Sequence, residues 1–148
     1  MKKLIIYMLA ILFFAILLIC FFNEYKTKNL VKEFFGTDSL VGETYDITII
    51  NHDNSIVNND FNSITTAIRK DSPLYPAFIN SLEKIIVKRT NNKFPYREGY
   101  SFIIYHNSAL NIIRLNKNGL LNFKEKTYEI QNTEAFEDLI EIIKESTD

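Results

Sequence analysis

The chain has 148 residues, with 17 Lys and Arg against 18 Asp and Glu and a formal net charge of −1. This balance argues against a nucleic acid as partner, because nucleic-acid-binding proteins usually carry a strongly basic surface. The single cysteine excludes an intramolecular disulfide, and a total of four glycines argues against glycine-rich nucleotide-binding loops.

The first predicted element is an unbroken apolar run over residues 4–22, LIIYMLAILFFAILLICFF. Nineteen helical residues rise about 28 Å, which is close to the hydrocarbon thickness of a bilayer. Fourteen of them are Leu, Ile or Phe, and each of these favours insertion by about 0.3–0.6 kcal/mol at a helix centre. We therefore expect a single transmembrane helix that places the protein in the cell membrane.

Two lysines precede this run, as in a secretory signal. A cleaved signal usually has a shorter apolar stretch followed by small residues, whereas Asn23 and Glu24 follow here. We therefore predict an uncleaved signal anchor, with residues 1–3 in the cytoplasm and the C-terminal domain outside it. The alternative is a lipid anchor on Cys20, although Ile19 is larger than the residue that usually precedes a lipidated cysteine.

The segment after the apolar run, residues 23–36, contains no proline, and its one glycine is the last residue. Apolar residues cluster at helical spacing from Leu30 to Phe35, so we expect the helix to continue as an amphipathic stalk that ends at Gly36. Residues 37–148 then form one folded domain, since about 110 residues suffice for a single hydrophobic core.

Strands are predicted in this domain where apolar residues alternate with polar ones or where β-branched residues gather. The pair Asn118-Gly119 predicts a type I′ hairpin, because both central residues of that turn need a positive φ. The predicted strands cover residues 45–50, 82–90, 100–106, 110–115, 120–123 and 127–130.

Two helices are predicted in the domain from apolar residues at helical spacing. One carries Phe61, Ile64 and Ile68 on one face, and the last is capped by Thr133. This order of elements predicts an α+β fold, with a small antiparallel sheet and two helices packed on one of its faces. The opposite face is expected to carry polar residues, among them Thr48, Lys84, Lys88, Ser101 and Asn111.

The stretch SFIIYHNSALNIIRLNKNGLLNFKEKTYEIQNTEAFEDLIEII, preceded by DITIINHDNSI and a short helix, resembles the small YhfM-like domains of Gram-positive envelope lipoproteins. The resemblance covers roughly residues 43–145 and rests on residue pattern and element order. The chain departs from the lipoprotein pattern at Ile19. Because no chemistry is assigned to that family, the resemblance implies a cell-envelope location and a fold, but no activity.

Motifs for common chemistries are missing from the sequence. It contains no phosphate-binding glycine loop, no GxSxG elbow and no HExxH motif. We therefore predict a protein that is not an enzyme, without catalytic, cofactor-binding or metal-binding residues. One alternative is a metal or acid–base pair formed by His52 and His106 at one sheet edge. Two solvated histidines in turns are the ordinary interpretation of the same residues.

Two further clusters have both a functional and an ordinary interpretation. The polar stretch 53–60 faintly resembles a calcium loop but lacks the Gly and Glu that an EF-hand needs, so a loop with a helix cap is the simpler interpretation. A basic and tyrosine-rich region suits anionic head groups or cell-wall polymers, a protein interface, or plain solvation. Its residues are Lys84, Lys88, Arg89, Lys93, Phe94, Tyr96, Arg97, Tyr100 and Tyr105.

Together these features predict a membrane-anchored binding or assembly module of the bacterial cell envelope. The abundance of Ile, Asn and Lys is typical of an AT-rich bacterial genome. The expected partners are the lipid bilayer, through residues 4–22, and a protein; no nucleic acid and no small-molecule cofactor is expected. The alternatives are a membrane-attached immunity or inhibitor protein, and an enzyme or metal site that uses His52 and His106.

Overall fold

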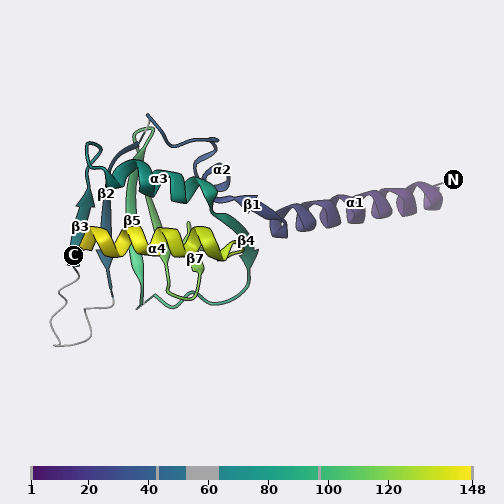
Figure 1. The fold of residues 1–148 in the computed structure, drawn as a ribbon. Helices are drawn as coiled ribbons and strands as arrows, with labels where there is room; N and C mark the ends of the chain where they lie inside the picture. Colours follow the sequence, from purple (N-terminus) through teal and green to yellow (C-terminus); the bar gives the residue numbers. More distant parts are fainter. Residues whose placement is uncertain (1, 43, 53–63, 97, 148) are drawn as a thin grey trace.

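The computed structural model describes residues 2–42, 44–52, 64–96 and 98–147. One long helix, α1 (Lys2–Tyr25), extends away from a head that contains the other elements (Figure 1). The stretch Ile5–Tyr25 has a mean hydropathy of 3.1, and the rest of the protein does not bury it. Among the described residues it is the one helix that is long and apolar enough to cross a membrane.

The head is built on one antiparallel sheet, to which eight strands contribute within the described residues. Their order across the sheet is β1-β4-β8-β7-β6-β5-β2-β3, so β1 and β3 form its two edges. The strands are β1 (Thr27–Asn29), β2 (Thr44–Asn51), β3 (Ile64–Ile68), β4 (Ile86–Thr90), β5 (Tyr100–His106), β6 (Ala109–Leu115), β7 (Leu120–Phe123) and β8 (Lys126–Ile130).

Helices α2 (Leu30–Phe35), α3 (Leu74–Lys84) and α4 (Thr133–Thr147) supply the other half of the hydrophobic core. In Figure 1, α3 and α4 lie side by side over the sheet. Phe78 of α3 packs edge-to-face on Phe102 of β5, with ring centroids 5.4 Å apart. Phe34 of α2 stacks on Phe123 of β7 at 4.3 Å. The predicted α+β fold is confirmed. Of the two helices expected in the domain, the last is found as α4, while α3 lies where no helix was expected.

The predicted continuous helix over residues 23–36 is wrong. The helix α1 ends at Tyr25, the chain runs extended through β1, and α2 is a separate helix. Pairing of β1 with β4 satisfies the backbone in the extended form, and the turn that follows buries Leu30 and Val31 completely. Gly36, with φ of 71°, follows the last residue of α2 as predicted.

The predicted helix that carries Ile64 and Ile68 is also wrong, since Ile64–Ile68 is strand β3, paired with β2 over five positions. Four of its five residues are β-branched, which favours a strand. Phe61, the remaining residue of that predicted face, lies outside the described residues. Conversely, residues 82–84 belong to α3, whose buried side chains include Phe78 and Leu82, and not to the predicted strand.

The tight turns differ from the prediction in one place. Two-residue turns with positive φ at both positions join β5 to β6 and β7 to β8. At the predicted type I′ pair only Gly119 has a positive φ, of 75°. The reason lies in Asn116, whose Oδ1 accepts hydrogen bonds from the backbone N–H groups of Asn118 and Leu120, at 3.0 and 2.7 Å. This side chain organises a longer loop between β6 and β7.

The open face of the sheet, away from the helices, is only partly as predicted. Thr48, Lys88 and Ser101 alternate with buried core residues and therefore lie on it. Asn111 is instead buried on the helix-covered face, opposite Ile104 in register. Lys84 is the last residue of α3 and not a strand residue.

Candidate functional site

The first feature with a functional consequence is the junction between α1 and the head. Only Lys26 separates the end of α1 from the start of β1. Strand β1 then joins the sheet edge by pairing with β4, with Thr27 opposite Lys88 and Asn29 opposite Ile86. The apolar helix therefore continues almost directly into the sheet, with no flexible linker between them.

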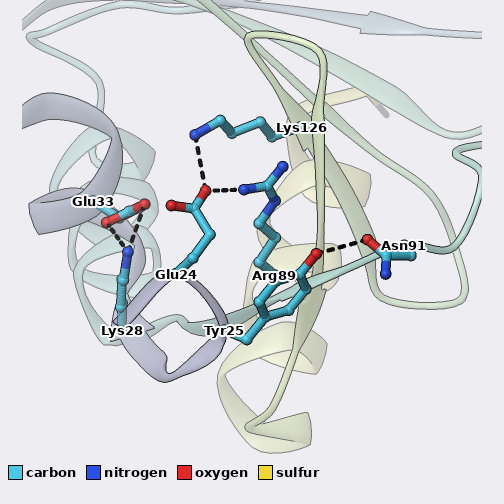
Figure 2. Close-up of polar contacts among 7 residues, drawn as sticks. All are labelled: Glu24, Tyr25, Lys28, Glu33, Arg89, Asn91 and Lys126. Carbon is cyan, nitrogen blue, oxygen red and sulfur yellow. Dashed lines mark hydrogen bonds and ion pairs between the residues drawn. The ribbon is translucent and has the colours of Figure 1, made fainter. Parts of the chain in front are cut away.

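Polar side chains fasten the end of α1 to three separate segments of the head (Figure 2). The Glu24 carboxylate forms an ion pair with Arg89 of β4 and a second one with Lys126 of β8, at 3.0 Å. The Tyr25 hydroxyl donates a hydrogen bond of 2.9 Å to Oδ1 of Asn91, in the β4–β5 connection. The guanidinium of Arg89 also lies 5.6 Å from the centre of the Tyr25 ring.

The corner between β1 and α2 is fixed by a second set of contacts. Asn29 caps α2 by accepting the backbone N–H of Lys32 at 3.1 Å, and its side-chain amide donates to the Glu83 carbonyl at 2.6 Å. Lys28 forms an ion pair with Glu33 at 3.0 Å (Figure 2). Each partly exposed ion pair contributes at most about 1 kcal/mol. The strand pairing and the buried corner therefore hold the junction together. The two ion pairs of Glu24 add the orientation of α1.

Below this corner lies Tyr128, which is buried under α2. Burial raises the pKa of Tyr128 above its ordinary value of 10.0, and the negative charge of Glu33 raises that pKa further against an opposing effect of Arg89. A pKa that is higher in the folded than in the unfolded state gives stability that is complete below pH 10. That stability is lost as the pH rises through the folded-state pKa.

The variant Tyr128→Phe should therefore lose less stability than the parent between pH 9 and pH 11. At pH 7 its stability should lie within about 1 kcal/mol of the parent's, because only the hydroxyl is lost and the buried ring keeps its packing. Urea unfolding of the full chain in detergent micelles, followed by circular dichroism, measures both effects. Tyr96→Phe is the matched control, since Tyr96 is 59% exposed. An alkaline loss as steep in Tyr128→Phe as in the parent would contradict this role of Tyr128.

The second candidate is an apolar patch on the open face of the sheet. The patch consists of Tyr45, Tyr105, Leu110 and Ile112, which are 62%, 45%, 58% and 40% exposed. Tyr105 and Leu110 are register partners across β5 and β6, and Ile112 pairs with the half-buried Ile103 beside them. Sequence reasoning expected polar residues on this face. The sequence signal that was missed is the alternation within residues 109–115. Because Ile113 belongs to the core, Leu110 and Ile112 must point to the opposite face of the sheet.

A bulge in β2 brings Tyr45 into the patch. The register between β2 and β5 shifts between Thr44 and Ile47, and bulges redirect side chains in this way. The ring of Tyr45 consequently lies edge-on to that of Tyr105, with centroids 6.4 Å apart. The ammonium group of Lys70 stands 5.8 Å from the Tyr45 ring and gives the patch a cationic border.

The structure separates the two histidines that the alternative interpretation brings together. His52 follows the end of β2, where its backbone N–H binds the Gly99 carbonyl and its Nε2 lies 2.7 Å from Oγ of Ser101. His106 ends β5 at the opposite end of the same strand pair, packed edge-on against Phe35. The distance along β5 is roughly 20 Å or more. The alternative of a shared histidine site is therefore excluded, because β2 and β5 are antiparallel and place the two residues at opposite ends.

The basic, tyrosine-rich region does not form one surface. Arg89 is used at the junction, Phe94 is buried, and Tyr96 is near the guanidinium of Arg114, at 5.5 Å. Arg97 and the calcium-like stretch 53–60 lie outside the described residues. No group of three or more potential metal ligands is found among the residues that the structure describes.

No protein-family model, curated protein or solved structure matches this chain. The resemblance to YhfM-like domains therefore stays a prediction.

Proposed function

We propose that this protein is a single-pass, membrane-anchored binding or assembly module of the bacterial cell envelope, and that the apolar patch binds a protein partner. The observation that best supports the proposal is that an apolar helix of membrane-spanning length is joined to the edge strand of the sheet by a single residue. In this proposal α1 crosses the membrane and the head lies outside the cytoplasm. The protein catalyses no reaction and acts by presenting a surface.

The order of the strands supports this role. The helix α1 leaves from the β1–β4 edge, and β3 forms the far edge (Figure 1). Strands β6, β5 and β2, which carry the patch, are four to six strand positions from β1. With about 4.8 Å between strands, the patch stands roughly 20–30 Å from the membrane-proximal edge. That height clears the lipid head groups and suits contact with another envelope protein.

The chemistry of the patch favours a protein partner with a complementary apolar surface. Exposed aromatic residues supply large contact areas at low entropic cost, and tyrosine is enriched in protein interfaces. Two of the four patch residues are tyrosines. The cationic border at Lys70 suits a partner whose rim is acidic.

Site-specific photocrosslinking in intact membranes tests the proposal. A benzoylphenylalanine in place of Tyr105 should give one discrete crosslinked band, and the band should weaken at least five-fold in L110S/I112S. The exchange V41S removes another exposed apolar side chain and should leave the band unchanged. A probe in place of Glu137, exposed on α4, should capture nothing.

Equal crosslinking from Tyr105 and Glu137, or a band that does not respond to L110S/I112S, would contradict a role for the patch. A one-to-one toxin partner of nanomolar affinity would favour the immunity alternative. Protease treatment of intact cells tests the side of the membrane, because the head should be degraded without lysis. Protection of the head until lysis would contradict an extracytoplasmic head.

A further inference from the structure

A groove at the junction lies where α1 meets the head, and it is distinct from the patch. It is a shallow, open groove of about 620 Å³, lined by Phe21, Phe22, Asn23, Tyr25, Lys26 and Lys88. The first of these come from the last turns of α1, Lys26 is the connecting residue, and Lys88 comes from β4. The lining is therefore aromatic along α1, and two lysines contribute to it from the connection and from β4.

The two lysines of the groove differ from the other cations at the junction. Arg89 and Lys126 bind Glu24, and Lys28 binds Glu33. For Lys26 and Lys88, in contrast, no carboxylate of the described residues lies within ion-pair distance.

The nearest acidic neighbour of Lys88 by register is Glu129, its partner across β4 and β8, and the two form no ion pair. A smaller hollow of about 390 Å³ shares Asn23 and Lys26 with the groove. Its other lysines, Lys28 and Lys32, form ion pairs with Glu33 and Asp38.

The position of the groove relative to the membrane follows from the length of α1. The 21 residues of Ile5–Tyr25 rise about 31 Å, so Phe21 and Tyr25 fall at the level of the lipid head groups when the helix spans a bilayer. Aromatic residues favour this level. The rings of Phe21 and Tyr25 lie 4.8 Å apart, and the hydrogen bond to Asn91 holds Tyr25 in place.

We infer that this groove binds the head group of an anionic phospholipid. The phosphate lies between the ammonium groups of Lys26 and Lys88, and an acyl chain follows Phe21 and Phe22 along α1. The occupant is a lipid and not a soluble anion, because the aromatic wall continues into the apolar surface of the helix. The inference rests on the proposed membrane anchoring. Its consequence is that the bound lipid fixes how deep the head sits.

Lipid selectivity of the full chain in nanodiscs tests the inference. Nitroxide-labelled phosphatidylglycerol and phosphatidylcholine are the probes, and the motionally restricted fraction of each measures association. The parent should prefer phosphatidylglycerol, and each of K26Q and K88Q should reduce that preference about five-fold. The control K117Q/K144Q removes two positive charges, one more than either single variant, at exposed positions remote from the junction and should still keep the preference.

If K117Q/K144Q lost the preference for phosphatidylglycerol to the same extent, the effect would be one of net charge. That result would contradict a specific lipid site. No preference in a parent that resists carbonate extraction would overturn the lipid site but not the anchor. A parent that does not enter nanodiscs would overturn both. Inorganic phosphate at 10 mM should leave the restricted phosphatidylglycerol fraction unchanged, and full displacement would assign the groove to a soluble anion.

Discussion

Two arginines in the middle of α1, F14R/I16R, should convert the protein from carbonate-resistant to carbonate-extractable. An arginine at a helix centre opposes insertion by about 2.5–3.5 kcal/mol, whereas the residue it replaces favours insertion by about 0.3–0.6 kcal/mol. The double change of roughly 6–8 kcal/mol is comparable with the total that the fourteen Leu, Ile and Phe residues of the run supply. Both sites are exposed on α1, so the head should keep its fold.

Washing isolated membranes with alkaline carbonate, followed by immunoblotting of pellet and supernatant, measures the change. The variant F14L/I16V is the matched control, because it alters the same positions without adding charge. It should remain in the pellet with the parent. Recovery of F14R/I16R in the pellet at the parental level would show that this helix does not provide the membrane attachment.

The second large effect is expected in the core, where Phe102→Ala should destabilise the head by about 3–5 kcal/mol. Phe102 has no exposed surface, and its ring meets Phe78 edge-to-face between the sheet and α3. Truncation removes this contact and leaves a cavity that the surrounding residues fill only in part. Tyr105→Ala on the same strand is the control. Because Tyr105 faces outward and is partly exposed, its loss should cost less than about 1 kcal/mol.

Urea unfolding of the full chain in detergent micelles, followed by circular dichroism, compares these variants. If Phe102→Ala does not fold, Phe102→Leu provides the second test and should cost about 1–2 kcal/mol. A cost for Phe102→Leu equal to that of Tyr105→Ala, or smaller, would contradict the packing of α3 on β5.

The sequence predicts some elements of the head well because their residue pattern permits one interpretation. Residues 100–106 and 110–115 are rich in β-branched and aromatic or other apolar residues, and both are strands, with the second beginning one residue earlier at Ala109. Residues 64–68 are ambiguous, because Ile64 and Ile68 fit a helix face while the intervening Thr residues favour a strand. Pairing with β2 decides between these, and that partner is remote in sequence.

The junction was beyond prediction for the same reason. Residues 23–36 lack helix breakers, so local propensity predicts one helix. Extended residues 27–29 gain a partner only when β4 is in place. The contact of Glu24 with Arg89 likewise joins residues that are far apart in the sequence. The separation of the two histidines depends on the antiparallel pairing of β2 with β5, which their sequence neighbours do not encode.

The junction gives the apolar helix a second role besides attachment. A flexible linker would let the head turn freely over the membrane, and its binding surface would point in many directions. Here the strand pairing of β1 and the contacts of Glu24 and Tyr25 leave the head one orientation. In the proposed function, a partner that binds the patch therefore loses less orientational entropy.

The most direct test of this rigid connection is a distance measurement between the helix and the far edge of the sheet. Cys20 is exposed on α1 and is the only cysteine, and Ala67 is exposed on β3. Spin labels on Cys20 and on A67C, in full chains reconstituted into nanodiscs, report this distance by pulsed electron resonance. We predict a single narrow distribution on the order of 40 Å, which broadens in R89A/K126A. A distribution spread over tens of ångströms in the parent would contradict the rigid connection between helix and head.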